Sequence, residues 1–571
     1  MKITTNRRLF LQGTAVTGVA AALAGCSQQS ADEQKKQADA DNKKKADEQA
    51  ALPSTAWERA EYDAVKDGGT ITLAIAQIPV NWNPLNIDGN QVDTRRITEP
   101  MGNTSGITIT EEGAVELDPN YIESAEVTSE DPQIVTVKYN SKAKWENGKP
   151  VTVEDFKSQV ASLNGSNKAF TITSTQGWDL IKEVRPKGEH DMEIEYTTPF
   201  PDWMSFLYPT VPQEVTADPK AFNESLIEKP TLSKGPYKLS SLDKTGGVVT
   251  LERNPEWWGQ KGKLDTVIFQ VVTQQNQPQS FANGELDYLE IGDGDTLGQA
   301  KGRKGASIQK SNGLTWTHLT LNINGGGGAL ADVEARKAIF KAVDREAVSR
   351  AVVAPLESPI NLVNNYVYLP GQDGYEDSFD GFLDSADAKK AEKILTDAGY
   401  TKDGDVYAKD GKKLEFEIVI PAETKSNEDR AKQIMNDLNA IGFKVKLKTV
   451  PSDKYFNDYI IAKDFSAATF SWVGTVLAEL HGANLYLPDS NQNYTGVDDQ
   501  KLATLNEQMQ QELDPDKRRT VGNEFSKQQA STYSVLPFYA TPIIVGLTEG
   551  LVNIGASQFE TFDWTTVGFK A

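Results

Sequence analysis

The chain has 571 residues and a formal net charge of −22. Its length exceeds what one hydrophobic core supports, so two or three compact units are expected. The acidic balance excludes the basic face that nucleic-acid binding needs. The single cysteine excludes an internal disulfide and a zinc–thiolate cluster, and His190, His318 and His481 form no close-spaced pair. We therefore expect neither a metal nor a cofactor.

The chain begins with the layout of an export signal. Lys2, Arg7 and Arg8 precede an uncharged, mostly apolar run from 9 to 25, which is too short to span a bilayer. Residues 6–11 (NRRLFL) resemble a twin-arginine signal with Asn where Ser or Thr is usual. Paired arginines also serve Sec export, so both routes stay open.

Cys26 is the last residue of the motif Leu-Ala-Gly-Cys, which resembles a bacterial lipobox. A lipid on this thiol would hold the protein on the outer face of the cell membrane, because each buried CH₂ contributes about 0.8 kcal/mol. The alternative is a chance or buried cysteine behind a plain signal peptide. Residues 26–66 start with a charged stretch that has no apolar period, and we expect them to be a solvated tether.

Strand patterns begin at residue 70. Residues 70–76 read as an opening strand, and the loop 77–85 (QIPVNWNPL) follows it. Residues 117–139 contain a strand pair, with its strands at 126–128 and 134–139. In the segment 145–156 (WENGKPVTVEDF), Thr152 is placed to cap the start of a helix, and Asp155 follows three residues later, as in a capping box.

The stretch 235–287 contains three β-type runs, at 237–242, 248–252 and 264–272. Gly246-Gly247 separates the first two runs as a hairpin turn would, and Asn254-Pro255 stops the second. Trp257 and Trp258 follow, and their large apolar faces should seat this turn on a core.

The second half alternates helices and strands. Residues 386–398 read as a helix that ends at Gly399, and 427–441 as an amphipathic helix that ends at Gly442. A hairpin is expected to turn at Asp410-Gly411 before the second helix, and an alternating strand follows it from 443. This order predicts an α/β lobe.

Several of these sequence motifs together resemble those of the family 5 substrate-binding proteins of ABC transporters, the oligopeptide- and dipeptide-binding type. They are 145–155 (WENGKPVTVED), 235–237 (GPY), 251–255 (LERNP) and 284–287 (GELD). The resemblance implies an α/β, two-lobed, periplasmic-binding-protein-like fold with an inserted subdomain and a hinge between the lobes. The implied division is lobe I at 67–108, 233–320 and 535–571, the insertion at 109–232, and lobe II at 321–534.

The resemblance also implies where a solute would bind. The loop 77–85 would emerge at the cleft, and the strand 314–323 would cross between the lobes. A second strand would end near Trp472. Packing in a core is the alternative for both Trp82 and Trp472. The ligand-binding candidates are Asn81, Trp82, Asn83, Asn322, Asn324, Trp472, Thr475 and Glu479.

The chain departs from the family pattern at Thr475. In peptide binders of the family, an acid shortly after the tryptophan pairs with the free α-amine of the peptide. Here a neutral hydroxyl stands at that position and cannot replace a charge-assisted bond. Whether the nearby Glu479 takes over stays open.

The function that the resemblance implies is capture of oligopeptides and their delivery to the transmembrane permease of an ABC importer. We expect a monomer. The alternative is the same fold with an oligosaccharide or another non-peptide solute, with Trp82 and Trp472 stacking on sugar rings. An enzyme is not expected, because the chain has no Gly-x-Ser-x-Gly motif, no zinc-ligand pair and no phosphate loop.

Overall fold

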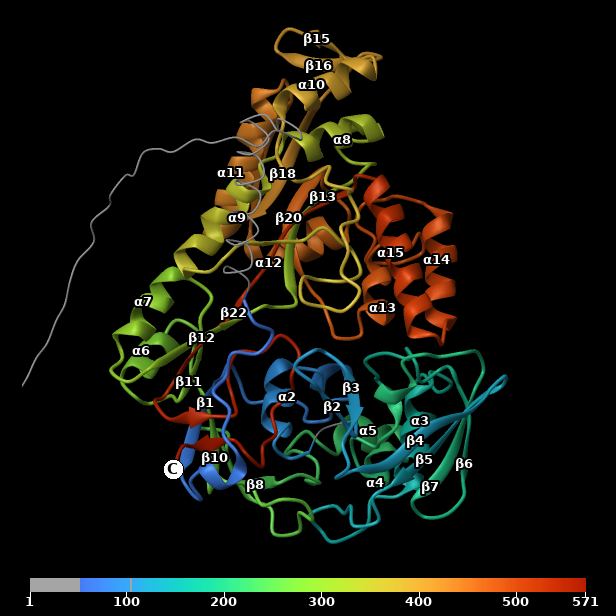
Figure 1. The fold of residues 1–571 in the computed structure, drawn as a ribbon, viewed down its shortest axis with the longest axis vertical. Helices are drawn as coiled ribbons and strands as arrows, with labels where there is room; N and C mark the ends of the chain where they lie inside the picture. Colours follow the sequence, from blue (N-terminus) through green and yellow to red (C-terminus); the bar gives the residue numbers. More distant parts are fainter. Residues whose placement is uncertain (1–51, 103–104) are drawn as a thin grey trace, which may run out of the picture. The chain divides into compact units, whose positions relative to one another are not determined.

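The computed structural model describes residues 52–102 and 105–571, which form a mixed α/β structure (Figure 1). The expected export signal, Cys26 and the tether up to residue 51 lie outside the described residues. Within the described part, no helix has both the length and the apolar composition needed to cross a bilayer.

A four-stranded sheet is the base of what we call the first lobe. Its order is β1-β10-β9-β8, with β1 parallel to β10 and the other pairs antiparallel. The strands are β1 (Thr70–Ile75), β10 (Thr266–Val271), β9 (Val248–Arg253) and β8 (Tyr237–Asp243). The predicted hairpin turn is confirmed, with Gly247 at a φ of 67°. Val249, Leu251 and Phe269 of this sheet are fully buried.

A smaller sheet, with the order β11-β22-β12, continues the first lobe. Its strands are β11 (Tyr288–Glu290), β22 (Ile543–Leu547) and β12 (Ser307–Ser311). The helices of this lobe are α2 (Val92–Thr98), α6 (Gln277–Ala282) and α7 (Gly294–Gly302). The short pair β23 (Leu551–Val552) and β24 (Gly568–Phe569) also belongs to it.

The inserted subdomain has its own sheet, in the order β4-β5-β7-β6. The elements are β2 (Ile107–Ile109), β3 (Val115–Leu117), β4 (Ile122–Glu130), β5 (Gln133–Tyr139), α3 (Val153–Leu163), β6 (Ile181–Pro186), β7 (Asp191–Tyr196), α4 (Gln213–Thr216) and α5 (Pro219–Glu224). The predicted cap of α3 is confirmed, since Thr152 and Asp155 form a capping box. Trp257 and Trp258 pack against the core of this subdomain, and the Trp258 indole donates to the Asn120 carbonyl at 2.7 Å.

A six-stranded sheet forms the second lobe, in the order β14-β21-β13-β20-β18-β19. The strands are β14 (Asn361–Leu362), β21 (Val535–Ala540), β13 (Thr315–Leu321), β20 (Ala467–Val473), β18 (Glu415–Pro421) and β19 (Lys444–Val450). The predicted strand–helix–strand unit is confirmed, because α11 (Lys425–Ala440) joins β18 to its parallel neighbour β19. The predicted turn at Asp410-Gly411 joins β16 (Val406–Lys409) to β17 (Lys412–Lys413), beside β15 (Thr401–Asp403).

Helices cover the second-lobe sheet, with α9 and α11 on one side of the view in Figure 1 and α13 to α15 on the other. Their bounds are α8 (Val333–Ala342), α9 (Arg345–Val353), α10 (Ala388–Asp397), α12 (Ser452–Lys454), α13 (Ala478–His481), α14 (Gln500–Gln511) and α15 (Pro515–Ser531).

The chain crosses between the lobes twice, from β12 to β13 and from β21 to β22. The two crossing segments lie side by side, since the Thr541 amide donates to the Thr315 carbonyl at 2.7 Å. A side chain on Gly313 would stand 2.1 Å from the Thr541 carbonyl oxygen, so only glycine fits there. The predicted crossover strand corresponds to β13, and the expected lobe boundaries were 320 and 535. Both β13 and β21 are already strands of the second-lobe sheet.

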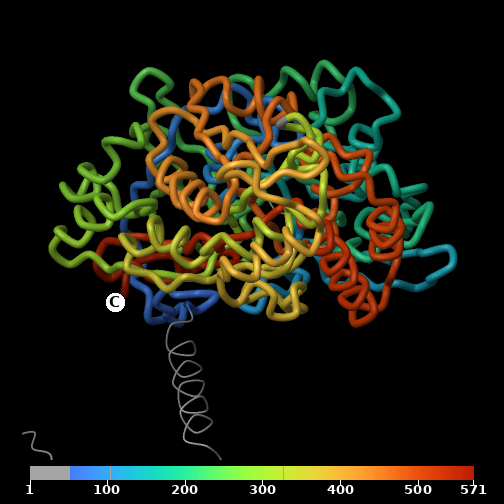
Figure 2. Tube along the Cα trace, turned by 90° about the horizontal axis from the view of Figure 1, so that it is seen from above, coloured from blue at the N-terminus to red at the C-terminus, as the bar shows by residue number. Residues whose placement is uncertain are grey.

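The expected tether is also too long. Residues 52–66 pack on the first lobe: Trp57 and Val65 are buried, and Val65 forms a β-bridge with Lys570. The Trp57 ring lies 5.2 Å from that of Phe562. Figure 2 shows the blue start of the described chain close to its marked C-terminus. These apolar contacts attach residues 52–66 to the first lobe.

A buried ion pair joins α15 of the second lobe to the inserted subdomain. The Arg518 guanidinium donates to both carboxylate oxygens of Asp202, at 2.9 Å for the first, and both side chains are less than a tenth exposed. Nearby, Leu480 packs into the subdomain core, and its carbonyl accepts a bond from the Gln176 amide. The ion pair thus lies in an enclosed contact between the second lobe and the inserted subdomain.

We expect Asp202→Asn to lower the free energy of unfolding by about 3–5 kcal/mol, because it leaves the Arg518 charge buried without its anion. Urea denaturation measures this loss. The matched control is Lys393→Ala, which breaks the exposed pair with Asp397 on α10 and should cost less than about 1 kcal/mol. Equal losses in the two variants would contradict the structural role of the buried pair.

Candidate functional site

The C-terminal half of β20 has an open edge. β20 pairs with β13 along its whole length, but on the other side β18 pairs only with Ala467 and Ala468. The Gly474 amide donates to the Leu314 carbonyl of the crossing segment. Because bonding direction alternates along an antiparallel strand, the backbone groups of Ser471 and Val473 point to the side without a partner strand. Both residues are exposed, Val473 at 77%.

Val473 also lines a cavity whose other walls come from the first lobe. The cavity has a volume of about 630 Å³. Its lining from the first lobe includes Arg95, Arg96, Glu99, Glu290, Phe562 and Trp564. A second cavity of about 740 Å³ shares Arg95, Glu99, Phe562 and Trp564 and extends towards the inserted subdomain. Together the two cavities give the open strand edge a large, charged and aromatic neighbourhood.

Helix α2 positions the charged wall of this cavity. Asp93, in its first turn, accepts bonds from the Ala76 and Gln77 amides at 3.1 Å each, which fixes the end of β1 to the helix. Arg96 donates to the Ala74 carbonyl and pairs with Glu290. Backbone groups at the carboxyl end of β1 therefore hold the side chains of Asp93 and Arg96 in place.

Glu99 has an unusual electrostatic environment. Burial raises the pKa of its carboxyl to about 7, and the Trp564 indole and the Arg96 charge oppose this shift only partly. The carboxyl group thus changes its charge near neutral pH within the cavity wall.

Asn81, Trp82 and Asn83 are buried and engaged within the fold. Trp82 is fully buried in the first-lobe core. The Asn81 and Asn83 amides donate to backbone carbonyls at the end of α5, at 3.1 and 2.9 Å. Of the two interpretations open for Trp82, the structure favours packing. The three side chains hold the loop 77–85 against the inserted subdomain.

Asn322 and Asn324 lie at the wrong end of β13. The strand leaves the crossing at Thr315, whose partner is Val473, and runs away from it into the second lobe. Asn322 donates to the Lys463 and Phe465 carbonyls at 3.0 Å each and accepts from the Asn324 amide. It therefore ties a loop at the end of the sheet remote from the cavity.

Trp472 is half-buried and packs within the second lobe. Its ring stacks on Tyr494 with centroids 5.7 Å apart and an angle of 11°, and on His318 at 6.1 Å and 17°. This arrangement favours the packing interpretation. Trp472 nevertheless lies between Ser471 and Val473, the two residues with outward-pointing backbone groups.

Thr475 and Glu479 are already engaged or enclosed. The Thr475 hydroxyl is buried and has no hydrogen-bond partner among the described residues, and its carbonyl accepts from Gln372. Glu479 accepts a bond from the Tyr368 hydroxyl at 3.1 Å and lines a separate cavity of about 360 Å³ with Arg519 and Phe559. Glu479 is therefore not brought to the cavity that Val473 lines.

The sequence did not point to Arg95, Arg96, Glu99, Val473 or Trp564. They come from a helix, a strand and the C-terminal segment, and no motif or spacing connects them. In the described part of the chain, no group of three or more His, Cys, Asp or Glu residues comes together as a metal site.

We expect the Glu99 carboxyl to make stability depend on pH. Its pKa is higher in the folded than in the unfolded protein, so the folded state holds the proton more tightly and loses stability as the pH rises from about 4.5 to 7. Glu99→Gln should remove about 1–3 kcal/mol of that loss. Urea denaturation at pH 5 and pH 8 measures it, with exposed Glu224→Gln as the control for a lost surface charge. The same pH dependence in wild type and Glu99→Gln would contradict the role of Glu99.

Comparison with known proteins identifies relatives over almost the whole chain. The oligopeptide-binding protein OppA of Mycobacterium tuberculosis is 31% identical over 529 residues, which cover 92% of this chain and 89% of the relative. OppA of Bacillus subtilis is 24% identical over 421 residues, which cover 68% of this chain and 74% of that relative.

Solved structures share the two-lobed fold. The periplasmic EDTA-binding protein EppA superposes with a TM-score of 0.80 at 24% identity, over 91% of this chain and 99% of that one. AppA of Bacillus subtilis, solved with a nonapeptide, superposes with a TM-score of 0.67 at 18% identity. The match covers 89% of this chain and 100% of AppA. These are binding proteins, not enzymes. The family model for bacterial extracellular solute-binding proteins, family 5 (middle), matches residues 116–494. The chain belongs to this family of extracellular solute-binding proteins.

Proposed function

We propose that this protein captures oligopeptides at the cleft between its lobes and delivers them to the transmembrane subunits of an ABC importer. The observation that carries the proposal is the open edge of β20 beside the cavity. An extended peptide can add to such an edge through backbone hydrogen bonds, whatever its side chains are. The OppA relatives are oligopeptide-binding proteins, which supports a peptide as the solute.

The peptide's amine is not held as in the family pattern. The buried hydroxyl of Thr475 supplies no negative charge, and Glu479 lies in another cavity. Backbone bonds at Ser471 and Val473 then contribute most of the affinity, with burial of the peptide against Phe562 and Trp564. Closure of the lobes follows because only the closed state makes both sets of contacts.

A non-peptide solute is the second candidate. The likeness to an EDTA-binding protein and the presence of Arg95 and Arg96 in the cavity wall favour an anionic chelate over a sugar. An oligosaccharide has less support, because Trp82 is buried and Trp472 is already stacked on other rings.

We also propose an exported, monomeric lipoprotein. In this proposal, residues 1–25 are the signal, Cys26 carries the lipid, and 27–51 tether the folded part to the outer face of the membrane. The lobe boundaries move to the crossings at 312–314 and 541–542. The support is the lipobox-like word before the single cysteine and the packed structure that starts at Leu52.

We expect Val473→Pro to weaken peptide binding by about tenfold or more, because it removes an outward-pointing amide but no bond to β13. Isothermal titration with a pool of tri- to nonapeptides measures this. Val473→Ala is the control: it keeps the amide and should lose no more than about threefold.

Absence of peptide binding by the wild type, together with binding of iron–EDTA or an oligosaccharide from parallel titrations, would replace peptide capture by the second candidate. Equal affinity of wild type and Val473→Pro for the peptide pool would contradict the role of the strand edge.

We expect Cys26→Ser to release the protein from membranes into the soluble fraction while its peptide affinity stays the same. The reason is that the change removes the thiol that takes the lipid and nothing in the folded part. Fractionation of cells that express each form, with mass spectrometry of the mature N-terminus, measures the outcome. A wild-type N-terminus without lipid would contradict the anchor.

A further inference from the structure

Two leucines of the second lobe are buried in cores that belong to the other half of the molecule. Leu356 is 2% exposed and packs with Phe281 of α6 and Leu297 of α7 in a first-lobe core. Leu480 is 3% exposed and packs in the core of the inserted subdomain. We call these the α7 contact and the α13 contact. The lobes are therefore joined by more than the two crossing segments.

Polar groups hold the α7 contact as well. Leu356 ends the short 3₁₀ helix Ala354–Leu356, and Glu357 after it has a φ of 51°, in the left-handed region. The Lys310 ammonium of β12 donates to the carbonyls of Leu356 and Glu357, at 2.8 and 2.7 Å. Lys301 of α7 pairs with the Glu357 carboxylate. Two lysines of the first lobe thus fix a strained turn of the second lobe.

The α13 contact contains the buried ion pair. The Leu480 carbonyl accepts a bond from the Gln176 side chain at 3.1 Å, and Leu477 packs against the same core. Beside it, the Arg518 guanidinium holds both oxygens of Asp202. Separation of this contact would expose apolar surface to water and pull apart two charges that are enclosed together.

Both contacts lie close to the crossing segments. Lys310 stands four residues before Leu314, and Leu480 stands six residues after Gly474, whose amide donates to the Leu314 carbonyl. Even a fully extended chain covers only about 14 Å in four residues and about 22 Å in six. Figure 1 shows α7 and α13 on opposite sides of the crossing, where the two lobes meet. The crossing is thus flanked by one buried contact on each side.

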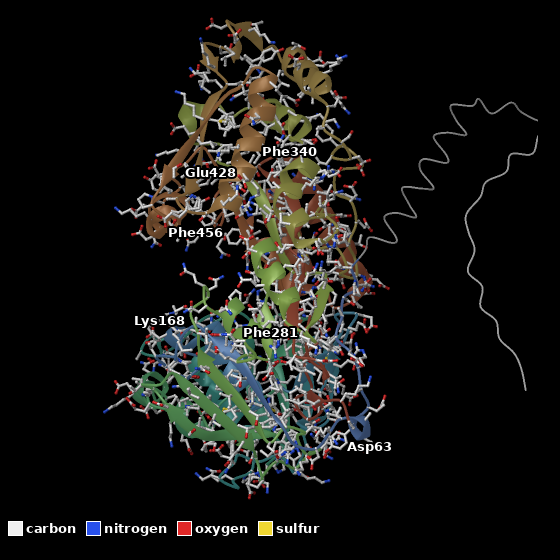
Figure 3. All side chains as sticks on the ribbon, turned by 90° about the vertical axis from the view of Figure 1, so that its left-hand side faces the viewer. Asp63, Lys168, Phe281, Phe340, Glu428 and Phe456 are labelled. Carbon is white, nitrogen blue, oxygen red and sulfur yellow. The ribbon has the colours of Figure 1, made fainter. Side chains whose placement is uncertain are left out.

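This arrangement restricts how the lobes can move. Two crossing segments alone would permit bending and twisting in several directions. Two further points of attachment, one on each side, leave rotation about the line that joins them as the movement that breaks neither contact. Figure 3 shows Phe456 of the second lobe and Lys168 of the inserted subdomain on one side of the molecule, with Phe281 of the α7 contact set back from both.

We infer that the α7 and α13 contacts are permanent fixed points of the hinge, and that the lobes open and close by rotation about the line through them. Phe456 and Lys168, far from this line, then change their separation most. The pair of Arg518 and Asp202 stays intact in the open and the closed state. The inference concerns the movement of the lobes alone and holds for any solute.

Distances between spin labels test the inference. Cys26 is the single cysteine of the chain, so Cys26→Ser gives a background in which only introduced cysteines are labelled. The first pair, Lys168→Cys with Phe456→Cys, spans the side that is expected to open.

Two further pairs report on the fixed points and use exposed residues. Gln299→Cys with Arg350→Cys spans the α7 contact, and Thr198→Cys with Lys517→Cys spans the α13 contact. Each pair is measured by double electron–electron resonance, first without solute and then with a pool of tri- to nonapeptides.

Over the two conditions, the distances of the pair at 168 and 456 are expected to spread at least about threefold more widely than those of either other pair. An equal spread, or a second population, for the pair at 198 and 517 would overturn the inference, because the α13 contact would then be a latch that breaks on opening. Equally narrow distances for all three pairs would also overturn it, because the lobes would then not rotate. Neither result depends on whether the peptides bind.

Leu480→Ala removes the apolar part of one fixed point. It is expected to widen the distances between 198 and 517 at least about twofold, because the second lobe can then also twist. The matched control is Leu505→Ala on α14, where a leucine that is 5% exposed packs inside the second lobe, and it should leave these distances unchanged. Thermal melting reports whether both variants fold. Unchanged distances in a folded Leu480→Ala would contradict the role of the α13 contact, and the three pairs without this change decide the inference if the variant does not fold.

Discussion

The structure depends on two crossing segments that lie in contact. The bond between Thr541 and Thr315 holds them together, and the close approach of Gly313 to the Thr541 carbonyl leaves no room for a side chain. Because both crossings enter the same sheet as neighbouring strands, β13 and β21 move with the second lobe as one body. Motion between the lobes then concentrates in a few residues at 312–314 and 541–542, as expected for a hinge.

The crossing segments also determine where the outward-pointing backbone groups of β20 lie. Val473 is paired with Thr315, the first residue of β13, so the open edge of β20 begins where the hinge ends. Residues near a hinge change their distance to the opposite lobe least during closure. The backbone contacts at Ser471 and Val473 are thus available in open and closed states, whereas contacts with Arg95 or Glu99 of the first lobe depend more on closure. In the proposed function, this difference lets a solute bind first and close the lobes afterwards.

The elements were largely predictable and the site was not. Alternating apolar residues, the caps at Thr152 and Gly442, and the turn at Gly246-Gly247 are local signals, and the structure contains each of them. The structure engages several of the candidate site residues within the fold, for a physical reason. Asn81 and Asn322 bind backbone in turns, a role that a sequence cannot separate from ligand binding, since the same amide serves both. Trp82 is buried in a core that includes Val215 and Leu226, which lie far away in the sequence.

Arg430 stands out from the local sequence pattern of α11. The apolar stripe of α11 includes Ala431, Ile434 and Leu438, which are fully buried, and Arg430 lies on that stripe one turn before Ile434. A charge at a position whose neighbours face the core is inconsistent with a purely structural helix. Arg336 and Arg345 break their own stripes too, but carbonyls of the fold accept their protons. Arg430 instead donates to the Thr469 and Tyr539 hydroxyls and to the Asn427 side-chain oxygen, which are all neutral groups. This arrangement arises only when β20, β21 and α11 are packed together, and it places a buried cation with neutral partners close to the open edge of β20.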